Sequence, residues 1–314
     1  MSKPSLSIIV ISFNTREMTL ECLRSVFKET RETGFELIVL DNASSDGSAG
    51  AIRTEFGDRI KLIASNQNLG FAAGNNRAAK DAHGDFLLLL NPDTVVLDGA
   101  IDRLMAFTKN CPGAGIWGGK TLFAGGTLNP ASCWQRQTVW SLLSQALGLS
   151  SLFRKSSLFN PEGMGGWNRE GIRQVDIVAG CFLLIRHDLW RELGGFGEMF
   201  FMYGEDADLC LRSKKLGAQP TVTSAAMIIH YGGASEKIMA DKLIRLLKAK
   251  SLLIQLHFPF RSRWLGLRLL SFWPKSRYLA FRILSVMRGG AALEKCKIWG
   301  EVCSRKKEWD VKVA

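Results

Sequence analysis

Acidic side chains come at or shortly after the ends of two apolar segments in the first hundred residues. Residues 86–90 are five consecutive apolar residues, and Asn91, Pro92 and Asp93 come after them, while Asp41 follows the segment 36–40, of which the last four residues are apolar. A short apolar run that ends in turn residues is typical of a strand buried on both faces. Since open α/β sheets bind ligands at the carboxyl ends of their strands, Asp41 is suited to a nucleoside and Asp93 to a divalent cation beside a diphosphate. The alternative is that both carboxylates only shape turns.

A second group of carboxylates lies within four positions, at Glu205, Asp206 and Asp208, after the glycine-rich segment 194–197. Acidic residues in the first turn of a helix are stabilised by the helix dipole, which is a purely structural explanation. Crowded carboxylates also raise one another's pKa, and a carboxylate with a raised pKa can serve as a general base near neutral pH.

The elements that must position these side chains alternate along the chain. Apolar segments predict strands at 6–11, 36–40, 60–64, 86–90, 175–185 and 221–229, with helices after the first strand and at 77–82 and 100–110. We expect Asn14 to cap the first helix with Glu17, and residues 66–76 to form a turn. Strands that alternate with helices at this spacing predict an α/β protein with a parallel, doubly wound sheet.

The turn after the first strand excludes two classes of nucleotide-binding protein. Residues 12–18 read SFNTREM and contain no glycine, so the chain has neither the dinucleotide fingerprint nor the P-loop there. Seven cysteines without a CxxC pair argue for a reducing compartment and against a zinc knuckle. Cys181 is expected to be a buried thiol because no histidine pattern that would activate it lies nearby.

The positive charge is concentrated near the end of the chain. The net charge is +12, residues 242–293 hold 11 Lys and Arg with no Asp or Glu, and residues 294–314 add +2, so residues 1–241 carry −1. We expect helices at 242–256, 264–273 and 278–286, interrupted by Pro259 and Pro274. Apolar residues alternating with cations favour a membrane surface over nucleic acid, and a packed subdomain with a solvated basic face is the structural alternative.

Four segments together resemble glycosyltransferase family 2. They are VISFN at 10–14, VLDNASSDGS at 39–48, NLGFAAGNN at 68–76 and LLLLNPDT at 87–94, and the last two are similar to the rhamnosyltransferase-like branch. The resemblance covers about residues 5–235. It implies the GT-A fold, an α/β doubly wound mixed sheet, in a domain at 1–240. This domain would have a nucleotide-sugar half at about 1–110 and an acceptor half at about 111–240, followed by a basic helical region at 241–314.

The resemblance also implies roles for individual residues. Asp206 would be the catalytic base, with Glu205 as the second choice, and Asp93 and His230 would hold Mg²⁺ or Mn²⁺. Asn91 replaces the first aspartate of the usual DxD motif, so Asp93 alone would supply the carboxylate. Asp208 and Tyr203 would contact the acceptor. The donor would be bound by Ser12, Asn14, Asp41, Asn68, Gly70, Asn75, Asn91 and Gly180.

The implied activity is an inverting sugar transfer. The donor would be a dTDP- or UDP-sugar, with dTDP-L-rhamnose as the single best choice, and the acceptor a glycan or lipid-linked hydroxyl in cell-surface polysaccharide synthesis. Without an apolar signal segment or a run of about 18–20 apolar residues, we expect a cytoplasmic protein, peripheral on the inner face of the cell membrane, with no nucleic-acid partner. A nucleotidyltransferase and a non-catalytic membrane-associated scaffold are the alternatives.

Overall fold

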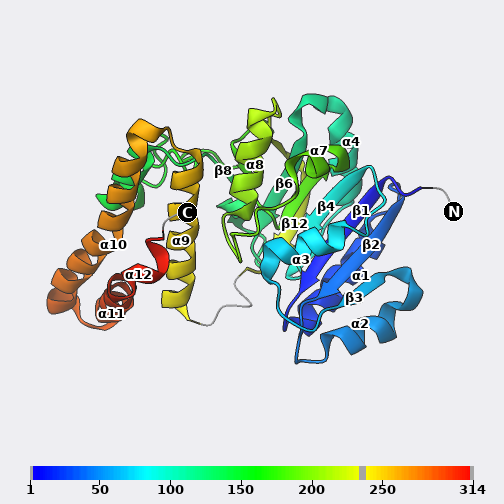
Figure 1. The fold of residues 1–314 in the computed structure, drawn as a ribbon, viewed down its shortest axis with the longest axis horizontal. Coiled ribbons are helices and arrows are strands. Elements are labelled where there is room, and N and C mark those ends of the chain that lie inside the picture. The colour runs from blue at the N-terminus through cyan, green and yellow to red at the C-terminus, as the bar shows by residue number, and fades with distance from the viewer. Residues whose placement is uncertain (1–2, 233–237, 312–314) are drawn as a thin grey trace. The chain divides into compact units, whose positions relative to one another are not determined.

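The computed structural model describes residues 3–232 and 238–311, which belong to two compact units (Figure 1). The first unit is Met1–Trp134 with Asn168–Ser235, and the second is Gln135–Trp167 with Glu236–Ala314. Part of the predicted acceptor half therefore belongs to the second unit. The physical reason is that helix α5 (Val139–Ala146) places Leu142 in the apolar core of that unit.

A mixed ten-stranded sheet forms the centre of the first unit, with the strand order β3-β2-β1-β4-β11-β6-β12-β5. β7 pairs with β6, and β9 pairs with β12. The four strands from β3 to β4 are parallel, whereas β11 is antiparallel to both β4 and β6. The bounds are β1 Leu6–Ser12, β2 Phe35–Asp41, β3 Lys61–Ala64, β4 Phe86–Leu90, β5 Thr94–Val96, β6 Ile116–Leu122, β7 Leu128–Asn129, β9 Ile172–Gln174, β11 Phe182–Arg186 and β12 Thr221–His230. β8 (Cys133–Trp134) and β10 (Ile177–Val178) form a separate pair.

Helices cover both faces of the sheet. Side chains of one face, such as Ile8 and Leu88, share a core with α1 (Arg16–Glu29), α2 (Ser48–Phe56) and α4 (Ala100–Asn110). On the other face, Gly74 of α3 (Gly70–Ala79) lies against Ile11 of β1. α7 (His187–Leu193) follows β11, and α8 (Glu205–Lys215) is joined to β10 through the Cys210 sulfur. The predicted alternation of strands with helices is confirmed, and the antiparallel strands make the sheet mixed. The segment predicted as one strand at 175–185, with an interruption at Gly180 and Cys181, forms two strands, β10 and β11, that belong to different sheets. The helix predicted at 77–82 ends at Ala79.

Two local predictions about helix starts were wrong. Asn14 does not cap α1, because it has a φ of 52° and Thr15 occupies the N-cap position. Residues 66–76 are not only a turn, because α3 begins at Gly70. Hydrogen bonds from neighbouring loops override the local helix-start signals at both places, since Asn14 is bonded to Ser45 and Leu69 to Asn42.

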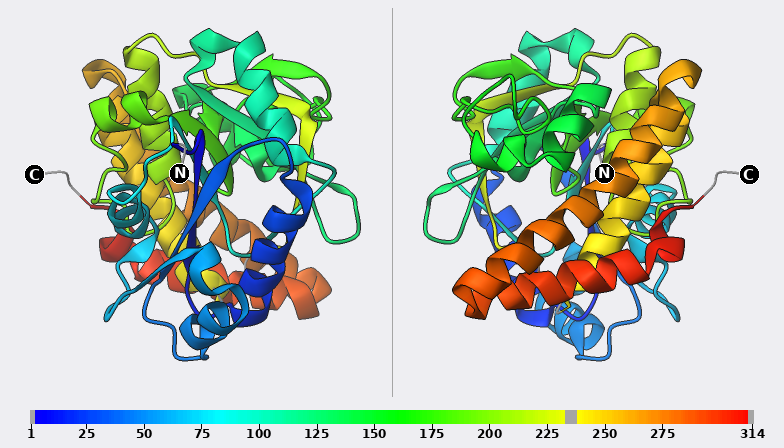
Figure 2. Two further views of the ribbon diagram at one scale, coloured as in Figure 1. Left: turned by 90° about the vertical axis from the view of Figure 1, so that its right-hand side faces the viewer. Right: turned by 90° about the vertical axis from the view of Figure 1, so that its left-hand side faces the viewer.

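The second unit is helical in its described residues. It contains α5, α6 (Leu149–Leu152), α9 (Met239–His257), α10 (Phe260–Arg288), α11 (Gly290–Ser304) and α12 (Lys306–Trp309), and the long helices pack together in Figure 2. Ile244, Ile254, Leu270, Val302 and Trp309 are members of its apolar core.

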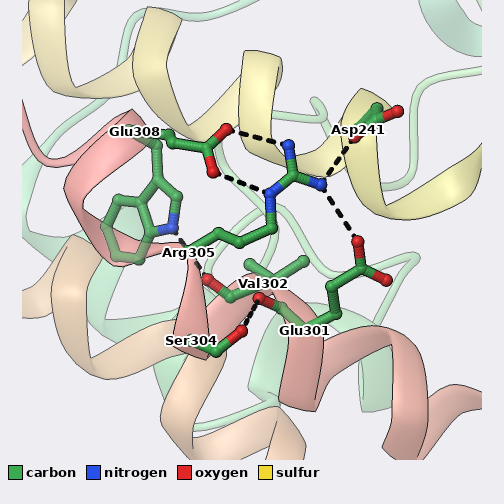
Figure 3. Close-up of polar contacts among 7 residues, drawn as sticks. Asp241, Glu301, Val302, Ser304, Arg305 and Glu308 are labelled. Carbon is green, nitrogen blue, oxygen red and sulfur yellow. Dashed lines mark hydrogen bonds and ion pairs between the residues drawn. The ribbon is translucent and has the colours of Figure 1, made fainter.

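Arg305 joins three helices of this unit (Figure 3). Its guanidinium donates to Asp241 of α9 at 2.7 Å, to Glu301 of α11 at 3.0 Å and to both oxygens of Glu308 of α12 at 2.8 Å. α12 is thereby fixed to the beginning of α9.

The predicted break at Pro274 was wrong, because α10 continues through this residue. Proline inside a helix costs about 3 kcal/mol through a lost hydrogen bond and a steric clash. Tertiary contacts around Pro274 offset that cost. Trp273 packs on the apolar core, the Ser276 hydroxyl donates to Ala146 O at 2.6 Å, and Arg277 donates to Gln145 O at 3.0 Å.

Among the helices that the structure describes, none has the length and apolar character to cross a bilayer.

Candidate active site

The carboxyl ends of β1 and β2 bring Ser12 beside Asp41, which are register partners. Asp41 is only 3% exposed, and its Oδ2 accepts a hydrogen bond from Ser44 N at 3.1 Å. Its Oδ1 is buried and has no hydrogen-bond donor among the described residues. Because an unsatisfied buried acceptor costs about 1–3 kcal/mol, this oxygen is suited to accept a hydrogen bond from a ligand.

Ser12 and Asn14 hold the loops around Asp41 together. Ser12 is fully buried, with its Oγ 3.0 Å from Thr19 Oγ1. Asn14 accepts through Oδ1 from Ser45 N at 2.8 Å, and its backbone N–H donates to Ser44 Oγ at 3.0 Å. These contacts explain why Asn14 lies outside α1. They position the segment that follows Asp41, and direct contact of either side chain with a donor stays a prediction.

Asn42 connects β2 to the start of α3 and is a site residue that the motif assignment missed. Its Nδ2 donates to Asn68 Oδ1 at 2.9 Å, its Oδ1 accepts from Leu69 N at 2.8 Å, and Asn68 Oδ1 also accepts from Gly70 N at 2.9 Å. The sequence does contain a signal for this role, because Asn42 directly follows Asp41 at the predicted end of a strand. Asn75 lies deeper in α3, is 1% exposed and donates to Phe71 O of its own helix at 2.9 Å.

Gly70 lies where another loop approaches closely. Its φ is +78°, and a Cβ there would be 2.5 Å from Phe201 O. The next residue, Phe71, donates its backbone N–H to Phe201 O at 2.9 Å. The segment before α8 therefore packs directly on the start of α3, which requires glycine at position 70.

Asn91, Asp93 and His230 converge at the ends of β4 and β12. His230 Nε2 is 3.4 Å from Asp93 Oδ1 and 3.4 Å from Asn91 Nδ2, and Asp93 Oδ2 accepts from Gly232 N at 3.1 Å. Asn91 Oδ1 and His230 Nδ1 are buried without a hydrogen-bond partner among the described residues. The remainder of the predicted motif, residues 233–235, lies outside the described residues.

Opposing effects act on the pKa of His230. Burial lowers its pKa, but the sulfur of Cys181 and the hydrogen bond to the Asp93 carboxylate outweigh burial and raise the pKa to about 10. Cys181 itself is a buried free cysteine, as predicted.

These three side chains fit a divalent cation whose coordination is completed by other ligands. The described residues contain no group of three or more His, Cys, Asp or Glu that could hold a metal. Asp93 would supply one carboxylate, and the unpartnered Asn91 Oδ1 is a further oxygen donor. His230 would ligate the ion only as the neutral imidazole, so binding would have to displace the proton that its raised pKa retains. Mg²⁺ typically binds one or two carboxylates and takes its other ligands from water and phosphate, so the residues present suffice for that arrangement.

Asp206 is fixed at the start of α8 by two backbone groups. Gly180 N donates to its Oδ2 at 3.0 Å, and Ala207 N donates to its Oδ1 at 2.7 Å. Burial raises the pKa of Asp206, and these N–H groups limit the rise. For the adjacent Glu205, which is 5% exposed, burial and the charge of Asp206 raise the pKa well above its usual range. Burial therefore disfavours the ionised form of both carboxyl groups, and the charge of Asp206 adds to this effect at Glu205.

Gly180 lies between two parts of the site. A Cβ at this position would be 3.3 Å from the Phe71 ring and 3.6 Å from Asp206 Cβ. The next residue, Cys181, accepts at its carbonyl from Asn91 N at 3.2 Å. The start of α3, the end of β4 and the start of α8 are thus connected through Gly180 and Cys181, which brings the predicted donor, cation and base residues together.

Asp208 makes a structural contact. It is 5% exposed, and its Oδ2 accepts from Arg212 Nε at 2.7 Å. Arg212 also donates to Leu193 O at 2.7 Å and to Gly195 O at 2.8 Å, so the pair holds the glycine-rich loop to α8. Tyr203 lies in the segment before α8 with a φ of 72°. Acceptor contacts by Asp208 and Tyr203 stay predictions.

Similarity to known proteins agrees with this geometry. The family described as glycosyl transferase family 2 matches residues 7–190, more than half of the chain. The O-antigen biosynthesis protein RfbC of Myxococcus xanthus is 28% identical over 236 residues, which cover 74% of this chain and 18% of that protein. The N-acetylglucosaminyl-diphospho-decaprenol L-rhamnosyltransferase of Mycobacterium tuberculosis is 26% identical over 218 residues, which cover 64% of this chain and 67% of that protein. Rhamnosyltransferase WbbL of Escherichia coli is 29% identical over 191 residues, 56% of this chain and 66% of that protein.

Solved structures show the fold. The mannosyltransferase PcManGT from Pyrobaculum calidifontis, solved in complex with GDP-Man and Mn²⁺, superposes with a TM-score of 0.60 at 15% identity and covers 99% of this chain and 89% of its own. TarS of S. aureus gives a TM-score of 0.53 at 14% identity, with 96% of this chain and 55% of that chain covered. The mixed sheet, the four linked motifs and the family match together establish that this chain has the GT-A fold and belongs to glycosyl transferase family 2.

Proposed function

We propose that this protein is an inverting glycosyltransferase that moves a sugar from a nucleotide donor to a hydroxyl group. The observation that carries the proposal is the Asp206 carboxylate, fixed by two backbone N–H groups beside a buried second carboxyl and joined through Gly180 and Cys181 to Asn91. A scaffold without activity has no need for a fixed carboxylate with a raised pKa at that place.

The reaction is a single displacement. Asp206 accepts the proton of the acceptor hydroxyl, and the oxygen attacks the anomeric carbon from the face opposite the leaving group. The bond from the anomeric carbon to the diphosphate oxygen breaks, and the nucleoside diphosphate leaves with its electron pair. One displacement inverts the configuration without a covalent intermediate, so no nucleophilic side chain is required.

The donor would be held by the strand ends. Asp41 Oδ1 accepts from the nucleoside, while Ser12, Asn14, Asn68 and Gly70 keep the surrounding loops in place. Asn75 supports α3 from within. Asp93, His230 and Asn91 face the diphosphate, where Mg²⁺ or Mn²⁺ would neutralise the developing charge when bound.

The substrates are proposed from chemistry and from the relatives' names. Two relatives are named as rhamnosyltransferases, which favours dTDP-L-rhamnose as donor, with UDP-sugars as the alternative. A decaprenyl diphosphate is part of the name of the mycobacterial relative, which favours a lipid-linked acceptor in cell-surface polysaccharide synthesis. We place the protein in the cytoplasm, peripheral on the inner face of the membrane.

The decisive experiment compares Asp206→Asn with the wild-type protein for turnover and for donor binding. We expect the variant to lose about 10²–10⁴ in turnover of the sugar nucleotide, with a donor Kd within about twofold of wild type, measured by calorimetry. Asp188→Asn, which changes an exposed carboxylate on α7, is the matched control and should keep full turnover. If the wild-type protein binds nucleotide sugars but turns over none of them, the non-catalytic scaffold is the better explanation.

A further inference from the structure

The exposed side of α10 consists of apolar and cationic residues only. Among residues 260–287, the exposed large apolar side chains range from 36% exposed at Leu265 to 88% at Val286. We call the following set the outer face of α10: Phe260, Trp264, Leu265, Phe272, Leu279, Ile283, Val286 and Met287, with the exposed cations Arg261, Arg268, Lys275 and Arg282. The only other exposed residue in this range is Ala280.

The spacing of these residues organises them into two rows. Arg261, Arg268, Lys275 and Arg282 recur every seven positions, and Leu265, Phe272, Leu279 and Val286 recur with the same spacing. Seven residues are close to two turns of an α-helix. Each set therefore forms a row along the axis, and a row of cations runs beside a row of apolar side chains over most of the helix.

The opposite side of α10 already accounts for the packing of the second unit. Leu270 is 1% exposed in the apolar core, and Gly266 lies so close to Phe258 that a Cβ would be 2.9 Å from its ring. Ser276 and Arg277 bond to the end of α5. The outer face contributes nothing to these contacts, so folding of the unit does not explain its apolar residues.

A surface of this kind indicates a partner, because large exposed apolar side chains gathered on one face of a helix, with cations beside them, mark an interaction site. The charge identifies the partner. Residues 242–293 contain 11 cations and no carboxylate, so two copies joined through this face would place cations opposite cations. Nucleic acid would satisfy the cations but would leave aliphatic side chains such as Leu279 and Val286 against phosphates.

We propose that the outer face of α10 lies flat on an anionic phospholipid bilayer. The row of apolar residues enters the boundary between headgroups and acyl chains, and the row of cations contacts the lipid phosphates. This deepens the proposed function by naming the surface that would bring the protein to a lipid-linked acceptor, and it rests on that function only for its biological reason.

Vesicle sedimentation with the full chain tests the proposal. The wild-type protein should bind to vesicles of phosphatidylcholine that contain about 30% phosphatidylglycerol, and much more weakly to vesicles of pure phosphatidylcholine. The bound fraction should fall as the salt concentration rises. A triple variant Arg268→Gln, Lys275→Gln, Arg282→Gln should lower the partition coefficient on the order of 100-fold. Arg53→Gln, Lys109→Gln, Lys215→Gln, which removes three exposed cations of the first unit, is the control with the same change in net charge and should bind as wild type.

The apolar row is tested separately. Leu279→Ser with Val286→Ser should weaken binding by about tenfold or more, whereas Ile172→Ser with Leu216→Ser, at exposed positions of the first unit, should not. Quenching of tryptophan fluorescence by brominated lipid should fall in Trp264→Phe. Thermal midpoints of all variants report on folding.

Three results would overturn the proposal: equal binding of the control and α10 cation variants, absence of wild-type binding to anionic vesicles, or a dimer in solution that Leu279→Ser with Val286→Ser dissociates. Turnover of the sugar nucleotide with a water-soluble acceptor tests the proposed function separately from the membrane-binding proposal. The α10 variants should retain that turnover, and its absence in the wild-type protein would count against the transferase and not against the membrane surface.

Discussion

At the scale of single residues, the site depends on polar atoms that the fold leaves without partners. Asp41 Oδ1, Asn91 Oδ1 and Glu205 Oε2 are all buried with no hydrogen-bond donor among the described residues. A buried acceptor in this state is costly unless a ligand satisfies it. The raised pKa of Glu205 favours its neutral form, which is less costly to bury than the carboxylate, whereas Asp41 Oδ1 and Asn91 Oδ1 are available to ligands.

The raised pKa of Glu205 predicts a dependence of stability on pH. At a pH below the usual pKa of a glutamate, the Glu205 carboxyl is protonated in both the folded and the unfolded chain. As the pH rises, the unfolded chain releases this proton first, because the pKa is raised only in the folded chain. The free energy of unfolding therefore falls until the pH passes the raised pKa. Glu205→Gln removes this loss. We expect its thermal midpoint to exceed that of wild type by a few degrees at pH 7–8 and to match it near pH 4, while the exposed control Glu192→Gln tracks wild type throughout.

Asn91 permits a test of the cation site. Its unpartnered Oδ1 is next to His230 and Asp93, so Asn91→Asp would add a second carboxylate where the common motif has one. We expect the affinity for Mn²⁺ in the presence of nucleoside diphosphate to rise roughly tenfold, measured by electron paramagnetic resonance. Asn110→Asp, an exposed position at the end of α4, should leave it unchanged, and an unchanged affinity in Asn91→Asp would argue against a cation at this place.

At the scale of elements, the start of α3 is held between two loops. Asn42 bonds to Asn68 and Leu69 from one side, and the segment that contains Phe201 covers Gly70 from the other. The conformation at the start of α3 therefore depends on the close approach of two backbone segments, the one at Gly70 and the one at Phe201.

Gly70→Ala tests that arrangement. The new Cβ would be 2.5 Å from Phe201 O at a residue with a φ of +78°, so we expect a loss of stability of more than about 1 kcal/mol and a raised KM for the donor. Gly50→Ala in α2 is the matched control, since a Cβ there meets nothing within 4 Å. It should be neutral or stabilising by about 0.4–1 kcal/mol, and equal effects of the two substitutions on KM would sink the explanation.

At the scale of the whole molecule, the two units, each with its own apolar core, hold different kinds of polar residue. The predicted site residues all lie in the first unit, whereas the concentrated positive charge belongs to helices of the second. We propose that the first unit performs the transfer and the second selects where the protein does so.

Ligand binding should stabilise the protein in proportion to occupancy. A nucleoside diphosphate with Mn²⁺ at about 100 times its Kd adds about 2.7 kcal/mol to the free energy of unfolding, which scanning fluorimetry detects as a higher midpoint. The shift should shrink with EDTA and with a nucleoside monophosphate, because both remove part of the diphosphate–cation contact. No shift with dTDP, UDP or their sugars would contradict a nucleotide site.

The sequence by itself determined β1 to β4, β11 and β12, the helix at α4 and the place of α8, because apolar runs and glycine boundaries are local signals. It also marked Asp41, Asp93 and Asp206, since each comes directly at an element boundary. The tertiary structure decided what no local pattern encodes. The loop bonds of Asn14, the close contact at Gly70 and the continuity of α10 through Pro274 all depend on partners distant in sequence. Which oxygens of the site lack partners could be known only once every neighbouring donor had its place, because hydrogen-bond satisfaction is a property of the packed fold and not of a residue type.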